Sequence, residues 1–293
     1  MTEVRLTMLN SMAGTDFESA LDRHVAWGLR DLDLRDAIAG KWLDELTLDE
    51  ARDAAERIRA RRLRVHCLSS RVFDTDLRDG EAAFRGEHLA ALSHVLELAR
   101  IFAPRLVRLI AARDGAREPD DGVDAVLDRY PWAIDVYRQA IDAIDAAGFG
   151  ATIENEARGC ILAATDDFTR FFDRLDRPGR VVLTWDVHNQ WAAAAGHLPS
   201  LDDYETLRPL IGYVHLKGGQ AAADGRTLAL NVALEETTFD VVGITERVVR
   251  DGVSPVLCLN APGHGEDIEG YDYAAVTERD LVHLRTRVEG VAW

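Results

Sequence analysis

The chain has 293 residues, of which 47% are hydrophobic, and it carries a formal net charge of −17. A chain of this length can bury a substantial core, either as one large domain or as two small ones. Its acidity opposes general nucleic-acid binding, because such a chain would repel a phosphate backbone.

Short apolar runs alternate along the chain with longer segments of helical periodicity. The predicted strands span residues 4–9, 24–34, 63–70, 105–112, 151–157, 181–186, 211–219 and 254–260. The predicted helices span residues 16–23, 48–62, 86–103, 131–148, 166–176, 201–210, 239–252 and 271–288. Residues 113–122 and 219–238 are predicted to be irregular.

These elements form about eight strand–helix units, and the apolar strands lack strict alternation, as fully buried parallel strands do. The pattern predicts an α/β fold, a (β/α)8 TIM barrel, as a single domain over residues 1–293. An open doubly wound sheet is the alternative. Its dinucleotide-binding version is disfavoured, because no G-x-G-x-x-G follows the first strand.

The cysteines and the apolar runs indicate a soluble, cytoplasmic protein. Cys67, Cys160 and Cys258 include no C-x-x-C pair, so we expect neither a disulfide framework nor a structural zinc site. The first residues lack the basic segment and apolar core of a signal peptide. No apolar run approaches the roughly 20 residues that cross a bilayer, so we expect no membrane association.

Three polar residues end successive predicted strands in the second half of the chain. Glu154 ends ATIE, Asp186 ends VVLTWD and His215 ends IGYVH, with separations of 32 and 29 residues. Each separation is about one strand–helix unit, so the three would lie at the same level of adjacent strands and converge at the mouth of a barrel. This oxygen and nitrogen set suits a divalent metal ion such as Mn²⁺, Co²⁺ or Mg²⁺. The alternative for any one of them is a solvated loop residue or a helix N-cap.

The segments ATIENEA, LTWDVHNQW and YETLRPLIGYVHLKGG resemble the xylose isomerase-like TIM barrels of the sugar phosphate isomerase/epimerase type. In that family a Glu, an Asp, a His and a Glu, following strands five to eight, bind one metal. By this resemblance the first three correspond to Glu154, Asp186 and His215.

The fourth position departs from the family. Asn260 stands where the resemblance implies glutamate, 45 residues after His215. Asn260 is a weaker fourth ligand, or His264 or Glu266 in the same segment completes the site, or the metal and the activity are lost. An amide oxygen can bind a cation but cannot take a proton at neutral pH.

Further site residues are predicted around these ligands. His188 and Lys217 are candidate catalytic groups beside Glu154, the candidate base. His66, Trp185 and Asn189 are candidate substrate contacts, with a core role as the alternative for His66 and Trp185.

The predicted function is a divalent-metal-dependent isomerase or epimerase, or a related dehydratase. It would act on a keto-sugar, polyol or similar hydroxy-ketone by removing a proton next to a carbonyl. An abasic-site endonuclease shares this barrel but needs more metal ligands than the strand ends supply. A non-catalytic relative that serves as a binding or subunit protein is the other alternative. Apart from the small-molecule substrate, the expected partner is a second copy of the chain, with the helix over residues 86–103 supplying an apolar face.

Overall fold

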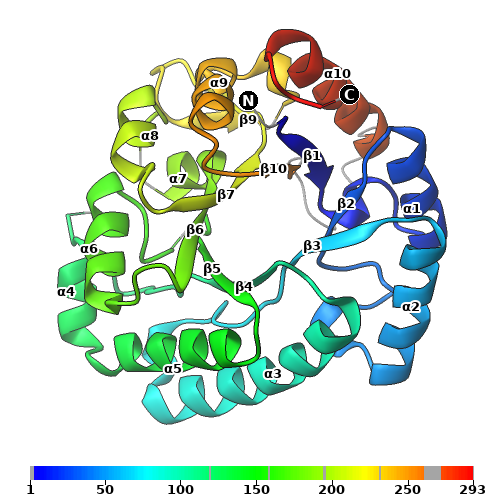
Figure 1. Ribbon diagram of the computed structural model, residues 1–293. Helices are drawn as coiled ribbons and strands as arrows, with labels where there is room; N and C mark the ends of the chain where they lie inside the picture. The colour runs from blue at the N-terminus through cyan, green and yellow to red at the C-terminus, as the bar shows by residue number, and fades with distance from the viewer. Residues whose placement is uncertain are drawn as a thin grey trace.

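The computed structural model describes residues 3–118, 120–157, 159–193, 196–230, 232–260 and 272–292. Within them, eight parallel strands form a nearly closed barrel, with their order around it β1-β10-β7-β6-β5-β4-β3-β2 (Figure 1). These strands are β1 (Arg5–Met8), β2 (Asp31–Leu34), β3 (Arg64–Leu68), β4 (Leu106–Ile110), β5 (Gly150–Glu154), β6 (Val181–Asp186), β7 (Ile211–Leu216) and β10 (Val256–Leu259). A β-bridge between Leu9 and Asp33 links the edge next to β1 with β2, the strands at the two ends of this order. The predicted TIM barrel is confirmed.

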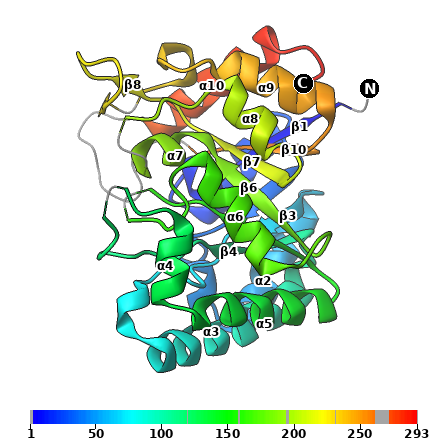
Figure 2. The ribbon, with the colours of Figure 1, turned by 90° about the vertical axis from the view of Figure 1, so that its left-hand side faces the viewer.

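Ten α-helices of the described residues surround this barrel, as the end-on and side views show (Figures 1 and 2). They are α1 (Phe17–Ala26), α2 (Leu48–Ala60), α3 (Glu81–Phe102), α4 (Val123–Arg129), α5 (Trp132–Ala146), α6 (Thr165–Leu175), α7 (Val187–Ala193), α8 (Leu201–Leu207), α9 (Val241–Asp251) and α10 (Tyr273–Arg287). Short 3₁₀ helices are η1 (Asn10–Met12), η2 (Leu43–Glu45), η3 (Leu77–Asp79) and η4 (Leu234–Glu236). None of the helices in the described ranges is long and apolar enough to cross a membrane.

Several helices begin where a side chain caps the first turn. The side chains of Asp16, Thr47, Asp240 and Asp272 each accept a hydrogen bond from the backbone N–H three residues later. These bonds satisfy N–H groups that have no partner within the helix. The caps thus set where each helix leaves its loop.

Residues 24–34 do not form the predicted single strand. Helix α1 continues to Ala26, and only Asp31–Leu34 is extended as β2. Between them, Gly28 has a φ of 77°, a conformation that glycine adopts without strain and that ends the helix. The alternation of apolar residues there comes from the helix end and the turn.

The irregular region after β7 contains a short antiparallel hairpin, β8 (Gln220–Ala221) and β9 (Leu228–Leu230). Its base is closed where the backbone N–H of Thr238 donates to the carbonyl of Gly219, 2.9 Å away. Gly218 has no room for a side chain, because a Cβ there would collide with the carbonyls of Val232 and Ala233. The returning chain therefore packs directly on the glycine pair that follows β7.

The helical surface shows few large apolar side chains. Among the described residues, the exposed large hydrophobic side chains are Val25 and Val282. Helix α3, which is described throughout and includes most of the predicted apolar face, contains neither of them. Self-association remains a prediction.

Candidate active site

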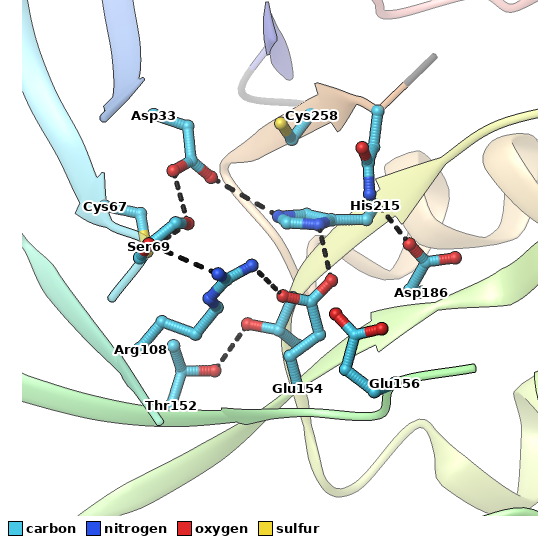
Figure 3. A network of polar contacts seen from close by, with 12 residues as sticks. Asp33, Cys67, Ser69, Arg108, Thr152, Glu154, Glu156, Asp186, His215 and Cys258 are labelled. Carbon is cyan, nitrogen blue, oxygen red and sulfur yellow. Dashed lines mark hydrogen bonds and ion pairs between the residues drawn. The ribbon is translucent and has the colours of Figure 1, made fainter. Parts of the chain in front are cut away.

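Glu154, Asp186 and His215 lie together at the carboxyl ends of β5, β6 and β7 (Figure 3). Each offers a ligand atom, and these atoms all lie within 4.8 Å of one another. No more than 1% of any of the three residues is exposed. The three side chains that were predicted to meet therefore share one position in the barrel.

Their register differs from the prediction that they lie at the same level of adjacent strands. Asp186 is paired with His215, but Glu154 is paired with Thr184, two residues before Asp186. The strands of a closed barrel are tilted and staggered, so side chains that meet in the interior need not be register partners. The three side chains can therefore converge although Glu154 is not at the same level of the sheet as Asp186 and His215.

Glu154 is held by a buried arginine side chain that the sequence analysis missed. Nη1 of Arg108, on β4, donates to Oε2 of Glu154, and its Nη2 donates to the carbonyls of Ser69 and Ser70, both at 3.2 Å. Burial raises the pKa of Glu154, but the charges of Arg108 and His215 outweigh burial and hold the pKa well below its ordinary value. Glu154 is therefore ionised at neutral pH.

Asp186 is surrounded by donors. Nζ of Lys217 lies 3.2 Å from its Oδ2, and Nδ2 of Asn260 donates to the same oxygen over 3.0 Å. Its Oδ1 accepts the backbone N–H of Asn189 at 2.9 Å. Since α7 starts at Val187, Asp186 caps this helix as well as facing the cluster. Asp186 thus combines a helix cap with a position in the cluster, which the sequence analysis had treated as alternatives.

His215 stands between two carboxylates (Figure 3). Its Nδ1 lies 2.9 Å from Oε1 of Glu154, and its Nε2 lies 3.3 Å from Oδ2 of Asp33, on β2. Burial lowers the pKa of His215, but the charge of Glu154 outweighs burial and raises the pKa well above its ordinary value. Without a metal ion, this imidazole carries a positive charge at neutral pH.

Four buried atoms of the predicted ligand set have no hydrogen-bond partner among the described residues. They are Oε1 of Glu154, Nδ1 and Nε2 of His215, and Oδ1 of Asn260. The contacts of the two ring nitrogens, with Glu154 and with Asp33, are ion pairs without hydrogen-bond geometry. Buried polar atoms are normally satisfied, so such a group calls for an explanation, and a bound ion is one. The two oxygens, together with a nitrogen of His215, are suitable donors to a divalent cation. The residues present therefore fit a metal ion.

The other predicted residues at the mouth have mainly supporting contacts. Nδ2 of Asn189 donates to the carbonyl of Asn155 at 3.0 Å, which ties the start of α7 to the end of β5. The centroid of the His188 ring lies 6.2 Å from that of Trp191. A Cβ added at Gly219 would lie 2.9 Å from Cδ2 of His188. His188 thus packs where α7 meets the segment after β7.

His66 and Trp185 do not join the cluster. The ring of His66 packs 4.8 Å from the ring of Tyr213, near charged residues at the amino ends of the strands, and burial lowers its pKa to about 4. Trp185 is fully buried, and its Nε1 donates to Gln190 at 2.7 Å. Both are buried, and no hydrogen bond, ion pair or ring contact among the described residues joins either of them to Glu154, Asp186 or His215. These contacts suit the core role, and substrate contact by either residue stays a prediction. His264 and Glu266 lie outside the described residues.

A further carboxyl group faces the cluster. The carboxyl of Glu156 lies beside that of Glu154 (Figure 3). Burial and the charge of Glu154 raise its pKa above the ordinary value. Its signal in the sequence is the spacing Glu154-Asn155-Glu156, which places two carboxyl groups two residues apart at a strand end.

The family model described as the xylose isomerase-like TIM barrel matches residues 22–285. The chain belongs to this family. The xylose isomerase-like resemblance of the second half of the chain is thereby confirmed, and the model extends it over most of the first half. A search of curated protein sequences found no match.

Solved structures of this type resemble the chain over nearly its whole length. A xylose isomerase-like TIM barrel protein from Mycobacterium smegmatis, in complex with magnesium, has a TM-score of 0.72 and 16% identity, covering 100% of this chain and 98% of that one. The probable 3-DHS dehydratase AsbF from Bacillus anthracis has a TM-score of 0.70 and 16% identity, covering 98% of this chain and 100% of that one. The 3-keto-D-glucoside 4-epimerase YcjR from E. coli has a TM-score of 0.68 and 15% identity, covering 97% and 100%. At these identities the likeness establishes the fold.

Proposed function

We propose that this xylose isomerase-like barrel is an isomerase, epimerase or dehydratase of a keto-sugar, polyol or similar hydroxy-ketone. The observation that carries the proposal is the buried meeting point of Glu154, Asp186 and His215 at the strand ends, where TIM-barrel enzymes have their active sites. The similar structures include a 3-keto-D-glucoside 4-epimerase and a probable 3-DHS dehydratase, which supports the reaction class.

Four side chains are proposed to hold a divalent cation: Glu154, Asp186, His215 and Asn260. The cation would polarise the substrate carbonyl and acidify the neighbouring carbon–hydrogen bond. Asn260 would contribute its unsatisfied Oδ1, since its Nδ2 already donates to Asp186. The magnesium complex of the similar protein from Mycobacterium smegmatis supports a divalent ion in this family.

Glu154 is proposed to take the proton from the substrate carbon. Arg108 holds its Oε2, whereas Oε1 has no hydrogen-bond partner among the described residues. A carboxylate oxygen has two lone pairs, so Oε1 can face a cation and still accept a proton. Because its low pKa makes Glu154 a weak base, the substrate must be acidified by positive charge nearby.

Lys217 is a second proposed source of positive charge, and it does not depend on a bound metal ion. It is 5% exposed, and its ammonium group, with three N–H donors, lies 3.2 Å from Asp186. A second N–H of this group would stabilise the oxygen of the enolate that forms when Glu154 removes the proton.

The fate of the enolate decides the product. Return of a proton to the other carbon gives an isomer, return to the opposite face gives an epimer, and loss of a β-hydroxyl group gives a dehydrated product. Glu156 is the proposed carrier of the second proton, and the position of its carboxyl beside that of Glu154 supports this role. His188, packed against Trp191 and Gly219, is the less direct candidate.

Proton exchange with solvent tests this proposal without knowledge of the substrate. The protein would be mixed with a panel of ketoses, ketose phosphates and hydroxy-ketones in D₂O with Mn²⁺, Co²⁺ or Mg²⁺, and deuterium uptake followed by NMR. We expect uptake at a carbon next to a carbonyl, and a loss of about 10³-fold or more in Glu154→Gln. The matched control is Glu97→Gln on the exposed surface of α3, which should exchange normally. A fully active Glu154→Gln would remove the base assignment.

A non-catalytic relative is the second candidate, and Asn260 is the observation that favours it. An amide in place of the fourth carboxylate weakens metal binding and cannot act as a base. Purified protein that contains no stoichiometric divalent ion, binds none when it is added, and exchanges no substrate proton would support this candidate over the enzyme.

A further inference from the structure

The carboxylate of Asp33 lies against the imidazole of His215 on the side away from Glu154 (Figure 3). Asp33 is fully buried in β2, on the opposite side of the barrel from β6 in the strand order. Its Oδ2 accepts the hydroxyl of Tyr213 at 2.9 Å, and its Oδ1 accepts the hydroxyl of Ser69. Two neutral donors therefore hold this carboxylate in place independently of His215.

The two ring nitrogens of His215 face different acids. Nε2 lies 3.3 Å from Oδ2 of Asp33, and Nδ1 lies 2.9 Å from Oε1 of Glu154. Both contacts are ion pairs without hydrogen-bond geometry. The ring of Tyr213 packs edge-on against the imidazole, with centroids 4.9 Å apart and an interplanar angle of 82°. Rotation of the imidazole would separate Nε2 from Asp33 and disturb this packing.

We propose that Asp33 is a positioning residue that holds Nε2 of His215 and thereby presents Nδ1 to the cluster of Glu154 and Asp186. A histidine that binds a metal ion through one nitrogen commonly donates its other N–H to a carboxylate, which fixes the ring orientation. Asp33 is the described carboxylate in that relation to His215. This inference rests on the divalent cation of the proposed function and names the residue that prepares its nitrogen ligand.

A metal ion between Asp33, His215 and Cys258 is the competing arrangement, since these residues also bring possible ligand atoms within 4.8 Å of one another. Both oxygens of Asp33 are already acceptors for Ser69 and Tyr213. The Sγ of Cys258 donates to the carbonyl of Leu259 at 3.5 Å. Both ring nitrogens of His215 lack a hydrogen-bond partner among the described residues, so they do not distinguish the two sides of the ring. The unsatisfied oxygens of Glu154 and Asn260 favour the side that faces Glu154.

The test is the affinity of the metal-free protein for Co²⁺, measured by its visible absorption and by calorimetry. Asp33→Asn should weaken Co²⁺ binding about 10- to 100-fold. The matched control is Asp31→Asn in the same strand. Asp31 is equally buried but pairs with Arg5 and Arg64, both at 2.7 Å. This control should lower the melting temperature and leave the Co²⁺ affinity unchanged.

Tyr213→Phe covers the case in which Asp33→Asn does not fold. It removes one hydrogen bond to Asp33 but keeps the ring, and it should weaken Co²⁺ binding about three- to tenfold. Unchanged Co²⁺ affinity in both variants would overturn the inference, and so would equal weakening in Asp31→Asn. A third outcome would also overturn the inference: Cys258→Ser loses Co²⁺ binding while Glu154→Gln keeps its affinity. That result would place the ion beside Asp33 and Cys258, on the other side of the His215 ring.

A crystal structure of metal-free Asp33→Asn, or of Tyr213→Phe if that variant alone folds, separates this inference from the proposed function. If the unaltered protein binds no Co²⁺, the metal ion of the proposed function fails, but the orientation of His215 is still measurable. An imidazole turned away from Glu154 in the variant supports the positioning role. An imidazole that stays in place overturns it.

Discussion

Arg108 donates to Oε2 of Glu154 inside the barrel, where 5% of the arginine and 1% of the glutamate are exposed. The same guanidinium also bonds to the carbonyls of Ser69 and Ser70 at the end of β3. It therefore joins three neighbouring strands and leaves Oε1 as the oxygen of Glu154 that faces His215.

Replacing Arg108 by Met should lower the free energy of unfolding by about 3–5 kcal/mol, because Glu154 would remain as a buried carboxylate without its main partner. Urea denaturation measures this loss. The double variant Arg108→Met with Glu154→Gln should recover part of it, since neither buried charge remains. A loss below about 1 kcal/mol in the single variant would show that the pair contributes little to stability.

Glu156→Gln should lower turnover by about 10²-fold or more, while the free energy of unfolding is unchanged or rises. Burial and the charge of Glu154 raise the pKa of Glu156, so the folded state already disfavours its ionised form, and a neutral amide avoids that cost. His188→Gln, altered at a residue packed against Trp191, should have the smaller effect on turnover. The reverse order of these two variants would transfer the second proton carrier to His188.

Asn260→Glu should tighten the binding of Mn²⁺ by about tenfold or more, because it adds a charged oxygen ligand where the family has a glutamate. In the metal-free protein the same change should be destabilising. It removes the hydrogen bond from Nδ2 to Asp186 and places two carboxylates together. Calorimetric titration and thermal unfolding, with and without Mn²⁺, measure both effects, and Asn260→Gln is the neutral control of equal length. Binding no tighter than in that control would exclude Asn260 as the fourth ligand position.

Asp280 predicts a pH dependence of stability away from the site. It is 2% exposed on α10, accepts the backbone N–H of Leu234 at 2.8 Å, and burial raises its pKa from 3.8 to about 7. Below pH 4 both the folded and the unfolded states hold this proton. Between pH 4 and 7 only the folded state keeps it, so stability falls as the pH rises.

Asp280→Asn should remove this dependence and be more stable than the unaltered protein at pH 8, by an amount of the order of 4 kcal/mol. Urea denaturation at pH 4, 6 and 8 measures the difference. Glu278→Gln, exposed on the same helix, should follow the unaltered protein at every pH. Parallel curves for Asp280→Asn and the unaltered protein would contradict the raised pKa.

The sequence predicted the barrel and the meeting of Glu154, Asp186 and His215, because both follow from periodicities along the chain. Buried strands are apolar, their carboxyl ends lie at one mouth, and the separations of 32 and 29 residues match one strand–helix unit. The register was wrong because stagger between strands leaves no trace in those separations: Glu154 is paired with Thr184.

Arg108 and Asp33 were missed for a related reason. Arg108 interrupts the apolar run RLVRLIAA, and Asp33 sits in the alternating run DLDL, where a charged side chain is usually assigned to solvent. Their partners, Glu154 and His215, lie 46 and 182 residues away along the chain. Only the closed barrel brings these pairs together, so local patterns could not reveal them.

The closed base of the hairpin after β7 separates the length of this segment from the position of the residues before it. Since Thr238 returns to Gly219, insertions or deletions between β8 and β9 leave the ends of that segment where they are. Such a change would alter the hydrogen bonds that Arg226, between β8 and β9, makes with Trp191 and Gly196. It would leave in place the strand end that carries His215 and Lys217.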